Sequence, residues 1–81
     1  MKMTAVKDEW TLVPLPGDKQ VVNQGFARAR VAQSDAKPTN LHDGELLSTY
    51  AENYAVVFVG GMQNTWVLGV GNDTLLSIEG V

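Results

Sequence analysis

The single histidine of the chain lies close in sequence to two carboxylates, a combination that can perform acid–base chemistry. His42 is followed directly by Asp43, and Glu45 comes two residues later. A histidine whose ring is oriented by a carboxylate can act as a general base. The alternative is an exposed turn residue next to Gly44, the usual role of a lone histidine in a polar loop. We favour the turn residue and expect no catalytic residue. We also expect no metal site, because these side chains lack the usual ligand spacing.

A glycine-rich segment near the C-terminus has the composition of a phosphate-binding loop. Residues 69–74 read Gly-Val-Gly-Asn-Asp-Thr. Such a loop needs a helix directly after it, whose N-terminus binds the phosphate. The next residues are Leu-Leu-Ser-Ile, which favour a strand instead. We therefore interpret the segment as a turn between two strands and expect no cofactor.

Charge and hydropathy exclude further classes of function. The formal net charge is −3 and the pI is about 4.8, whereas nucleic-acid binding normally requires a basic face. No stretch approaches the roughly 18 apolar residues of a membrane span. No apolar signal region follows Lys2 and Lys7. We expect a protein made in the cytoplasm, with neither a nucleic acid nor a membrane as its partner.

The size of the chain favours self-association. It has 81 residues and no cysteine. A single core of this size contributes only about 3–5 kcal/mol unless disulfides, a metal or association add to it. Because disulfides and metal sites are not expected, we predict a homo-oligomer, either a dimer or a trimer.

The apolar pattern predicts a small all-β domain. Short apolar runs are separated at short intervals by Gly, Pro, Asn and Asp, which is typical of an antiparallel β-sandwich or barrel. We expect about six to eight short strands in one β domain over residues 9–81. Residues 1–8 are polar and without a period, which predicts an N-terminal arm ordered on docking. The predicted strands cover residues 10–13, 20–22, 26–33, 45–48, 54–59, 65–70 and 74–79.

Two predictions concern the C-terminal half. Residues 54–59 (Tyr-Ala-Val-Val-Phe-Val) predict a central strand buried on both faces, with Phe58 in the core. The Gly-Asn-Asp turn at 71–73 predicts a hairpin that pairs residues 65–70 with 74–79. In that hairpin Leu75 would lie opposite Trp66 and Leu68, and Trp66 would also be a core residue.

Five residues are candidates for contact with a partner chain. Phe26, Arg28 and Arg30 alternate with small apolar residues and so share the outward face of their strand. Aromatic residues and arginine are enriched at the centres of protein interfaces, so we expect these three to bind a partner. The alternative for the arginines is a salt bridge within their own chain. Trp10 and Tyr50 are further candidates, as surface aromatics for a partner or a sugar ring.

The order of these features resembles small structural proteins of tailed-bacteriophage virions. The resemblance covers residues 10–80. It includes Trp-Thr-Leu-Val at 10–13, Val-Val-Asn-Gln-Gly at 21–25 and Gly-Glu-Leu-Leu at 44–47, and it extends through the last two predicted strands. Residues 51–54 depart from the pattern, being longer and more polar.

The resemblance implies a non-enzymatic β-sandwich that decorates or cements a capsid, or anchors a tail appendage, as a homo-oligomer. Its partners would be copies of itself and the major capsid or tail proteins, and its location would be the virion. The alternative function is a carbohydrate- or receptor-binding module of a tail tip or fibre. That module would use Trp10 or Tyr50, beside Asn53, as its aromatic platform.

Overall fold

The structure is a computed structural model that describes residues 1–52 and 55–81. In chain order its elements are β1 (Lys2–Ala5), β2 (Thr11–Leu12), β3 (Lys19–Asn23), β4 (Arg28–Gln33), β5 (Glu45–Leu47), the 3₁₀ helix η1 (Tyr50–Glu52), β6 (Val56–Val59), β7 (Thr65–Val70) and β8 (Thr74–Gly80).

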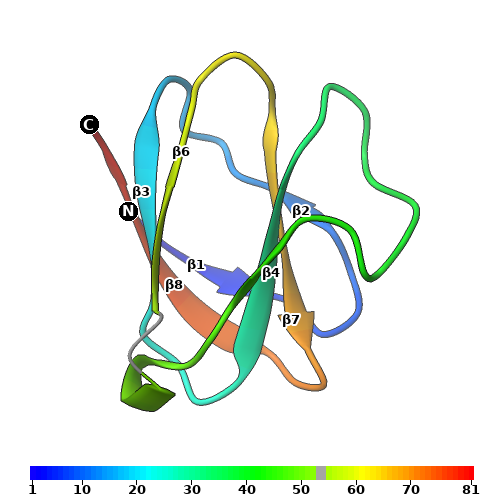
Figure 1. Cartoon of the computed structure of the whole chain (residues 1–81), viewed down its shortest axis with the longest axis vertical. Coiled ribbons are helices and arrows are strands. Elements are labelled where there is room, and N and C mark those ends of the chain that lie inside the picture. The colour runs from blue at the N-terminus through cyan, green and yellow to red at the C-terminus, as the bar shows by residue number, and fades with distance from the viewer. Residues whose placement is uncertain (53–54) are drawn as a thin grey trace.

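The eight strands form two separate four-stranded antiparallel sheets that pack face to face as a small sandwich. One sheet has the order β1-β8-β3-β6 and the other β2-β7-β4-β5. Figure 1 shows the first sheet on the left and the second on the right. This confirms the predicted all-β class and selects two sheets rather than a closed barrel.

The main core lies between the sheets and is built by the period-two alternation of the strands. In β4, Ala29 and Val31 point inward and are buried, while Arg28 and Arg30 point outward, as predicted. No aromatic ring belongs to this core among the described residues. Its buried members are Ala5, Val13, Val21, Ala29, Val31, Leu47, Val67, Leu76 and Ile78.

A second, smaller cluster lies on the outer face of the β2-β7-β4-β5 sheet. Trp10, Ala32 and Leu68 are buried there, and Trp66 and Val70 pack against them. An outer face of a two-layer sandwich is normally solvated, but here the loop of residues 34–44 folds back toward it. The 34–44 loop therefore covers part of this face, and the cluster lies between the loop and the sheet.

The predicted N-terminal arm over residues 1–8 is wrong, because Lys2–Ala5 form strand β1. It pairs antiparallel with β8 along four residue pairs, and Ala5 is completely buried. The following residues cross to the second sheet, where Gly69 N donates to Val6 O at 2.8 Å. A four-residue strand whose inward positions are Met3 and Ala5 carries little apolar signal, which explains the error.

The prediction for residues 54–59 is wrong in its burial. Strand β6 is at the edge of its sheet, paired only with β3 in the described part of the chain. Val57 and Val59 contact the main core, whereas Val56 is exposed and Phe58 is 70% exposed. An apolar, β-branched composition does not distinguish an edge strand from a central one. Tyr54, predicted as the first residue of this strand, lies outside the described residues.

The predicted C-terminal hairpin is also wrong, although both of its strands exist. β7 pairs with β2 and β4, while β8 pairs with β1 and β3, so the 71–73 turn passes from one sheet to the other. Leu75 is on the outer face of β8 and does not lie opposite Trp66. The positive φ of Gly71 suits either kind of turn, so the local sequence could not decide between them.

Candidate functional site

Two of the five predicted contact residues lie exposed at one end of the sandwich. Phe26 is fully exposed (102% of its reference area) in the β3–β4 turn, and Tyr50 is 69% exposed at the start of η1. Both segments lie at the lower end of the molecule in Figure 1. We call this surface, formed by residues 24–27 and 49–51, the aromatic end.

The turn that carries Phe26 is fixed by its backbone. Gln24 N donates to Leu75 O at 2.9 Å, which ties the turn to β8. Gly25 packs so closely on β8 that a Cβ at this position would overlap Thr74 Oγ1. The backbone beside Phe26 is therefore held in place, and the Phe26 ring projects into solvent.

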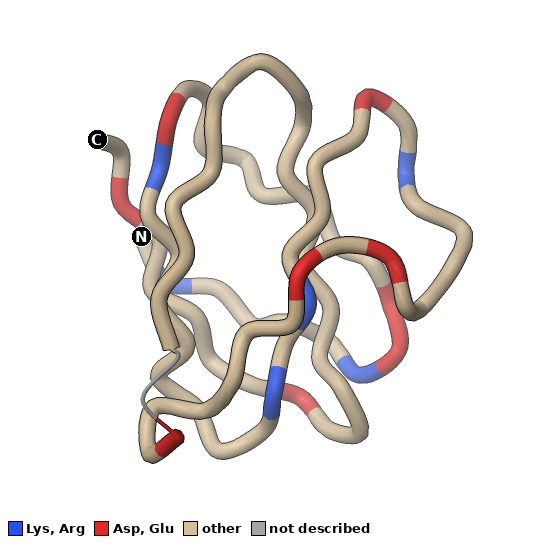
Figure 2. The backbone as a smooth tube through the Cα atoms, viewed as in Figure 1, with Lys and Arg blue, Asp and Glu red and all other residues tan. Residues whose placement is uncertain are grey.

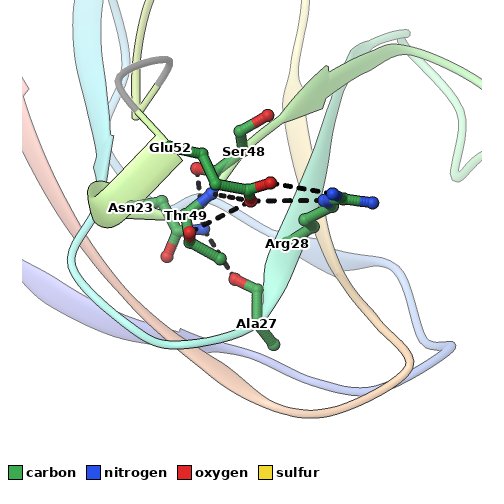
Figure 3. Close-up of polar contacts among 6 residues, drawn as sticks. All are labelled: Asn23, Ala27, Arg28, Ser48, Thr49 and Glu52. Carbon is green, nitrogen blue, oxygen red and sulfur yellow. Dashed lines mark hydrogen bonds and ion pairs between the residues drawn. The ribbon is translucent and has the colours of Figure 1, made fainter.

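A buried asparagine joins this turn to the neighbouring strands. Asn23 Nδ2 donates to Ala27 O at 2.7 Å and to Ser48 O at 3.2 Å (Figure 3). Its Oδ1 accepts from Gly25 N and from Thr74 Oγ1. Each polar atom of this fully buried amide is therefore satisfied, which makes the network a rigid support rather than a source of strain.

An ion pair holds η1 against the same end of the molecule. Arg28 donates from Nε and Nη2 to the two carboxylate oxygens of Glu52, at 3.3 and 2.8 Å (Figure 3). Thr49 donates to this carboxylate from its backbone N and its hydroxyl. The hydrogen bonds from Arg28 and Thr49 lower the pKa of Glu52 to about 2. Arg28 is thus paired within its own chain.

The exposed rings stand beside two hollows. Phe26, Thr49 and Tyr50 line a hollow of about 480 Å³, most of whose surface is apolar. On its other side Phe26 lines a hollow of about 630 Å³ that extends to the 71–73 turn. Phe26 therefore borders two hollows, into which a bound partner could extend on contact with the ring.

The other two predicted contact residues, Trp10 and Arg30, bond to the 34–44 loop instead. Trp10 is only 4% exposed, so its prediction as a surface aromatic is wrong. Its indole Nε1 donates to Asn40 O at 3.1 Å, and Trp66 Nε1 donates to Ser34 O at 2.9 Å. Arg30 is half-buried and donates to His42 O at 3.2 Å. These three side chains hold the 34–44 loop against the sheet.

Asn23 and Glu52, which position the aromatic end, are not among the predicted site residues. Glu52 had a readable signal, because Thr49-Tyr-Ala-Glu52 matches the Ser/Thr-x-x-Glu pattern of a helix N-terminus. Asn23 carried no such sequence signal, since its inward position follows only from the register of β3 with β8.

Other kinds of site find little support in the part of the chain that the structure describes. His42 is exposed, and no group of three or more His, Cys, Asp or Glu side chains in these residues is arranged to hold a metal. Lys and Arg positions are scattered along the tube without a continuous positive band (Figure 2). The helix described here is too short to cross a membrane.

Comparisons of the chain with protein families, with curated proteins and with solved structures found no match.

Proposed function

We propose that this chain is a non-enzymatic structural protein of a virion, which binds and stabilises a capsid or tail assembly through its aromatic end. The observation that carries the proposal is the full exposure of Phe26 on a turn whose backbone is fixed. Large exposed apolar side chains in a group are typical of protein interaction sites.

The form of this surface favours a protein partner. Phe26 and Tyr50 bring two large rings, and their supports are already ordered by Asn23 and by the Arg28–Glu52 pair. A preorganised surface loses little conformational entropy on binding. Aromatic anchors that enter concave pockets of a partner commonly dominate the energy of an interface. Many copies bound side by side would add weak contacts into a strong attachment.

The assignment to a virion rests on the resemblance described for residues 10–80. The two-sheet sandwich agrees with the fold that this resemblance implies. Mass spectrometry of purified particles of a phage that encodes this chain tests it directly. We expect the chain in stoichiometric amounts, and its absence from the particles would remove the virion assignment.

Self-association through the aromatic end is tested by light scattering at micromolar concentration. We expect a dimer or trimer for the unchanged chain and a monomer for the double variant Phe26→Ser, Tyr50→Ser. Phe58→Ser is the matched control, because Phe58 is as exposed as Tyr50 but lies on β6. A monomeric unchanged chain, or loss of the oligomer only in the Phe58 variant, would contradict this use of the aromatic end.

The carbohydrate-binding alternative now depends on Tyr50. Trp10 is buried and is not available to stack on a sugar ring. Asn53, the expected polar neighbour, lies outside the described residues. A glycan array tests this function, and specific binding that Tyr50→Ser abolishes would favour it over the virion proposal.

A further inference from the structure

A buried lysine lies at the end of the sandwich opposite to the aromatic end. Lys19, at the start of β3, is only 2% exposed and points inward with Val21 and Asn23. Strand β3 begins near the upper end of the molecule in Figure 1, beside the β6–β7 loop. Lysine is almost never fully buried unless its charge is paired.

The Lys19 ammonium group has little compensation within the chain. Its Nζ donates to Thr65 Oγ1 at 3.2 Å, which is the hydrogen bond found for its three N–H groups among the described residues. No described carboxylate is within 4.0 Å of it. The nearby Asp18 instead accepts from Gly61 N at 2.7 Å. Burying a charge without an opposite charge is costly, so a buried ammonium with only a hydroxyl as its partner favours an anionic ligand here.

Lys19 and its partner Thr65 both line a hollow of about 420 Å³. Two loops wall this hollow, residues 13–17 and residues 61–64. They are packed so tightly together that a Cβ on Gly61 would lie 2.6 Å from the carbonyl carbon of Gly17. Thr65 Oγ1 accepts from Lys19, so its own proton remains free to donate. Two residues that line one concavity thus carry adjacent donor groups, an ammonium and a hydroxyl whose heavy atoms are 3.2 Å apart.

We propose that this hollow is a binding site for a monocarboxylate, whose two oxygens accept from Lys19 Nζ and Thr65 Oγ1. The inference is independent of the proposed function, which concerns the other end of the sandwich.

The lining favours a singly charged ligand with an apolar body. Asp35 also lines the hollow, and its negative charge disfavours a doubly charged phosphate. Val13, Leu15 and Met62 provide apolar surface beside the polar groups. Residues 60–64 carry no charged side chain (Figure 2). The loop therefore neither repels an anionic ligand nor offers a carboxylate of its own to pair with Lys19.

The test is an NMR titration of the full ¹⁵N-labelled chain at pH 7 and constant ionic strength. Isovalerate is the ligand, and isovaleramide is its neutral counterpart of the same shape. We expect saturable shifts of the Lys19 Nζ signal and of the amides of residues 61–65. The dissociation constant should be on the order of a few millimolar for so small an acid. The amide should bind at least tenfold more weakly, because charge-assisted hydrogen bonds are the stronger kind.

Lys19→Met removes the charge and keeps the length of the side chain, and it should weaken isovalerate binding at least tenfold. Thr65→Val should weaken it about fivefold. Lys37→Met is the matched control, because it changes the net charge equally at an exposed position and should leave binding unchanged. Should Lys19→Met fail to fold, Thr65→Val and isovaleramide still decide the question.

Two sources of the carboxylate are distinguished by peptides. An apolar tetrapeptide with a free C-terminal carboxylate is compared with its amidated form. Tenfold tighter binding of the free peptide than of isovalerate identifies a polypeptide end as the natural ligand, and equal or weaker binding identifies a small acid. The proposal is overturned if neither ligand produces saturable shifts, if isovaleramide binds as tightly as isovalerate, or if Lys19→Met binds like the unchanged chain.

Discussion

The molecule uses its large aromatic residues in two opposite ways. Trp10 and Trp66 pack on the outer face of one sheet, and their indole N–H groups donate to carbonyls of the 34–44 loop. Phe26 and Tyr50 project into solvent from supports that other residues hold in place. The first pair is committed to the fold, whereas the second pair is free to contact a partner.

This difference shows that the role of an aromatic ring depends on what the chain places above it. A loop that returns over the sheet covers Trp10 and satisfies its one polar atom. No described segment covers Phe26, whose turn packs closely against β8 at Gly25. Burial makes a ring a stability determinant, and exposure leaves it available for binding.

The largest expected effect is that of Trp10→Ala. Removing a buried tryptophan costs about 3–5 kcal/mol, which is comparable to the whole stability of a domain this small. We expect a largely unfolded protein by circular dichroism and urea denaturation. Trp10→Phe is the control, because it keeps a buried ring and loses only part of the packing together with the hydrogen bond to Asn40 O. A cost below about 1 kcal/mol for Trp10→Ala would break the contrast between the two aromatic pairs.

Asn23→Ala tests whether the buried hydrogen bonds of Asn23 support the aromatic end. The variant leaves several buried polar partners unsatisfied, and each costs about 1–3 kcal/mol. We expect a loss of about 2–4 kcal/mol in the free energy of unfolding, with the exposed rings themselves unchanged. The matched control is Asn64→Ala, an exposed asparagine that donates to Asp35 O. Equal costs for the two variants would contradict the supporting role of Asn23.

A smaller effect is expected from acid. Glu52 has a pKa of about 2 in the folded chain, below the value of about 4.3 expected when unfolded. Because the folded pKa is depressed, its stabilisation is fully present above about pH 4.3 and is lost as the pH falls toward 2. The measurement is the ¹³C carboxyl shift of Glu52 against pH.

Arginine variants check the cause of this shift. Arg28→Met should return the pKa of Glu52 toward its ordinary range, because Arg28 is the main cause of the lowering. Arg30→Met should leave it unchanged, since Arg30 bonds to the 34–44 loop instead. An equal change in the pKa of Glu52 in both variants would show that the ion pair with Arg28 is not what lowers it.

The smallest expected change in stability is that of Phe26→Ser or Tyr50→Ser. Exposed side chains contribute little to the folded state, so we expect the free energy of unfolding to stay within about 0.5 kcal/mol. Urea denaturation measures this, alongside the association experiment for the double variant. A loss as large as that of Trp10→Ala would show that these rings are structural.

Much of the strand pattern could be predicted from the sequence, and part of the site as well. Strands β3, β4, β5, β7 and β8 lie within a few residues of the predicted runs, because alternation and turn residues are local signals. Phe26 and Tyr50 were expected at the surface and are exposed there. Trp10 was misplaced, since nothing near it in the sequence shows that residues 34–44 return to cover it.

The sequence by itself determined the all-β class and the inward face of β4. Tertiary structure decided which strands pair, which edge is left open and which rings are covered. The physical reason is that strand composition records burial on a pleated face, whereas pairing depends on contacts between distant segments. The 71–73 turn illustrates this, because the same Gly-Asn-Asp sequence could close a hairpin and instead joins two sheets.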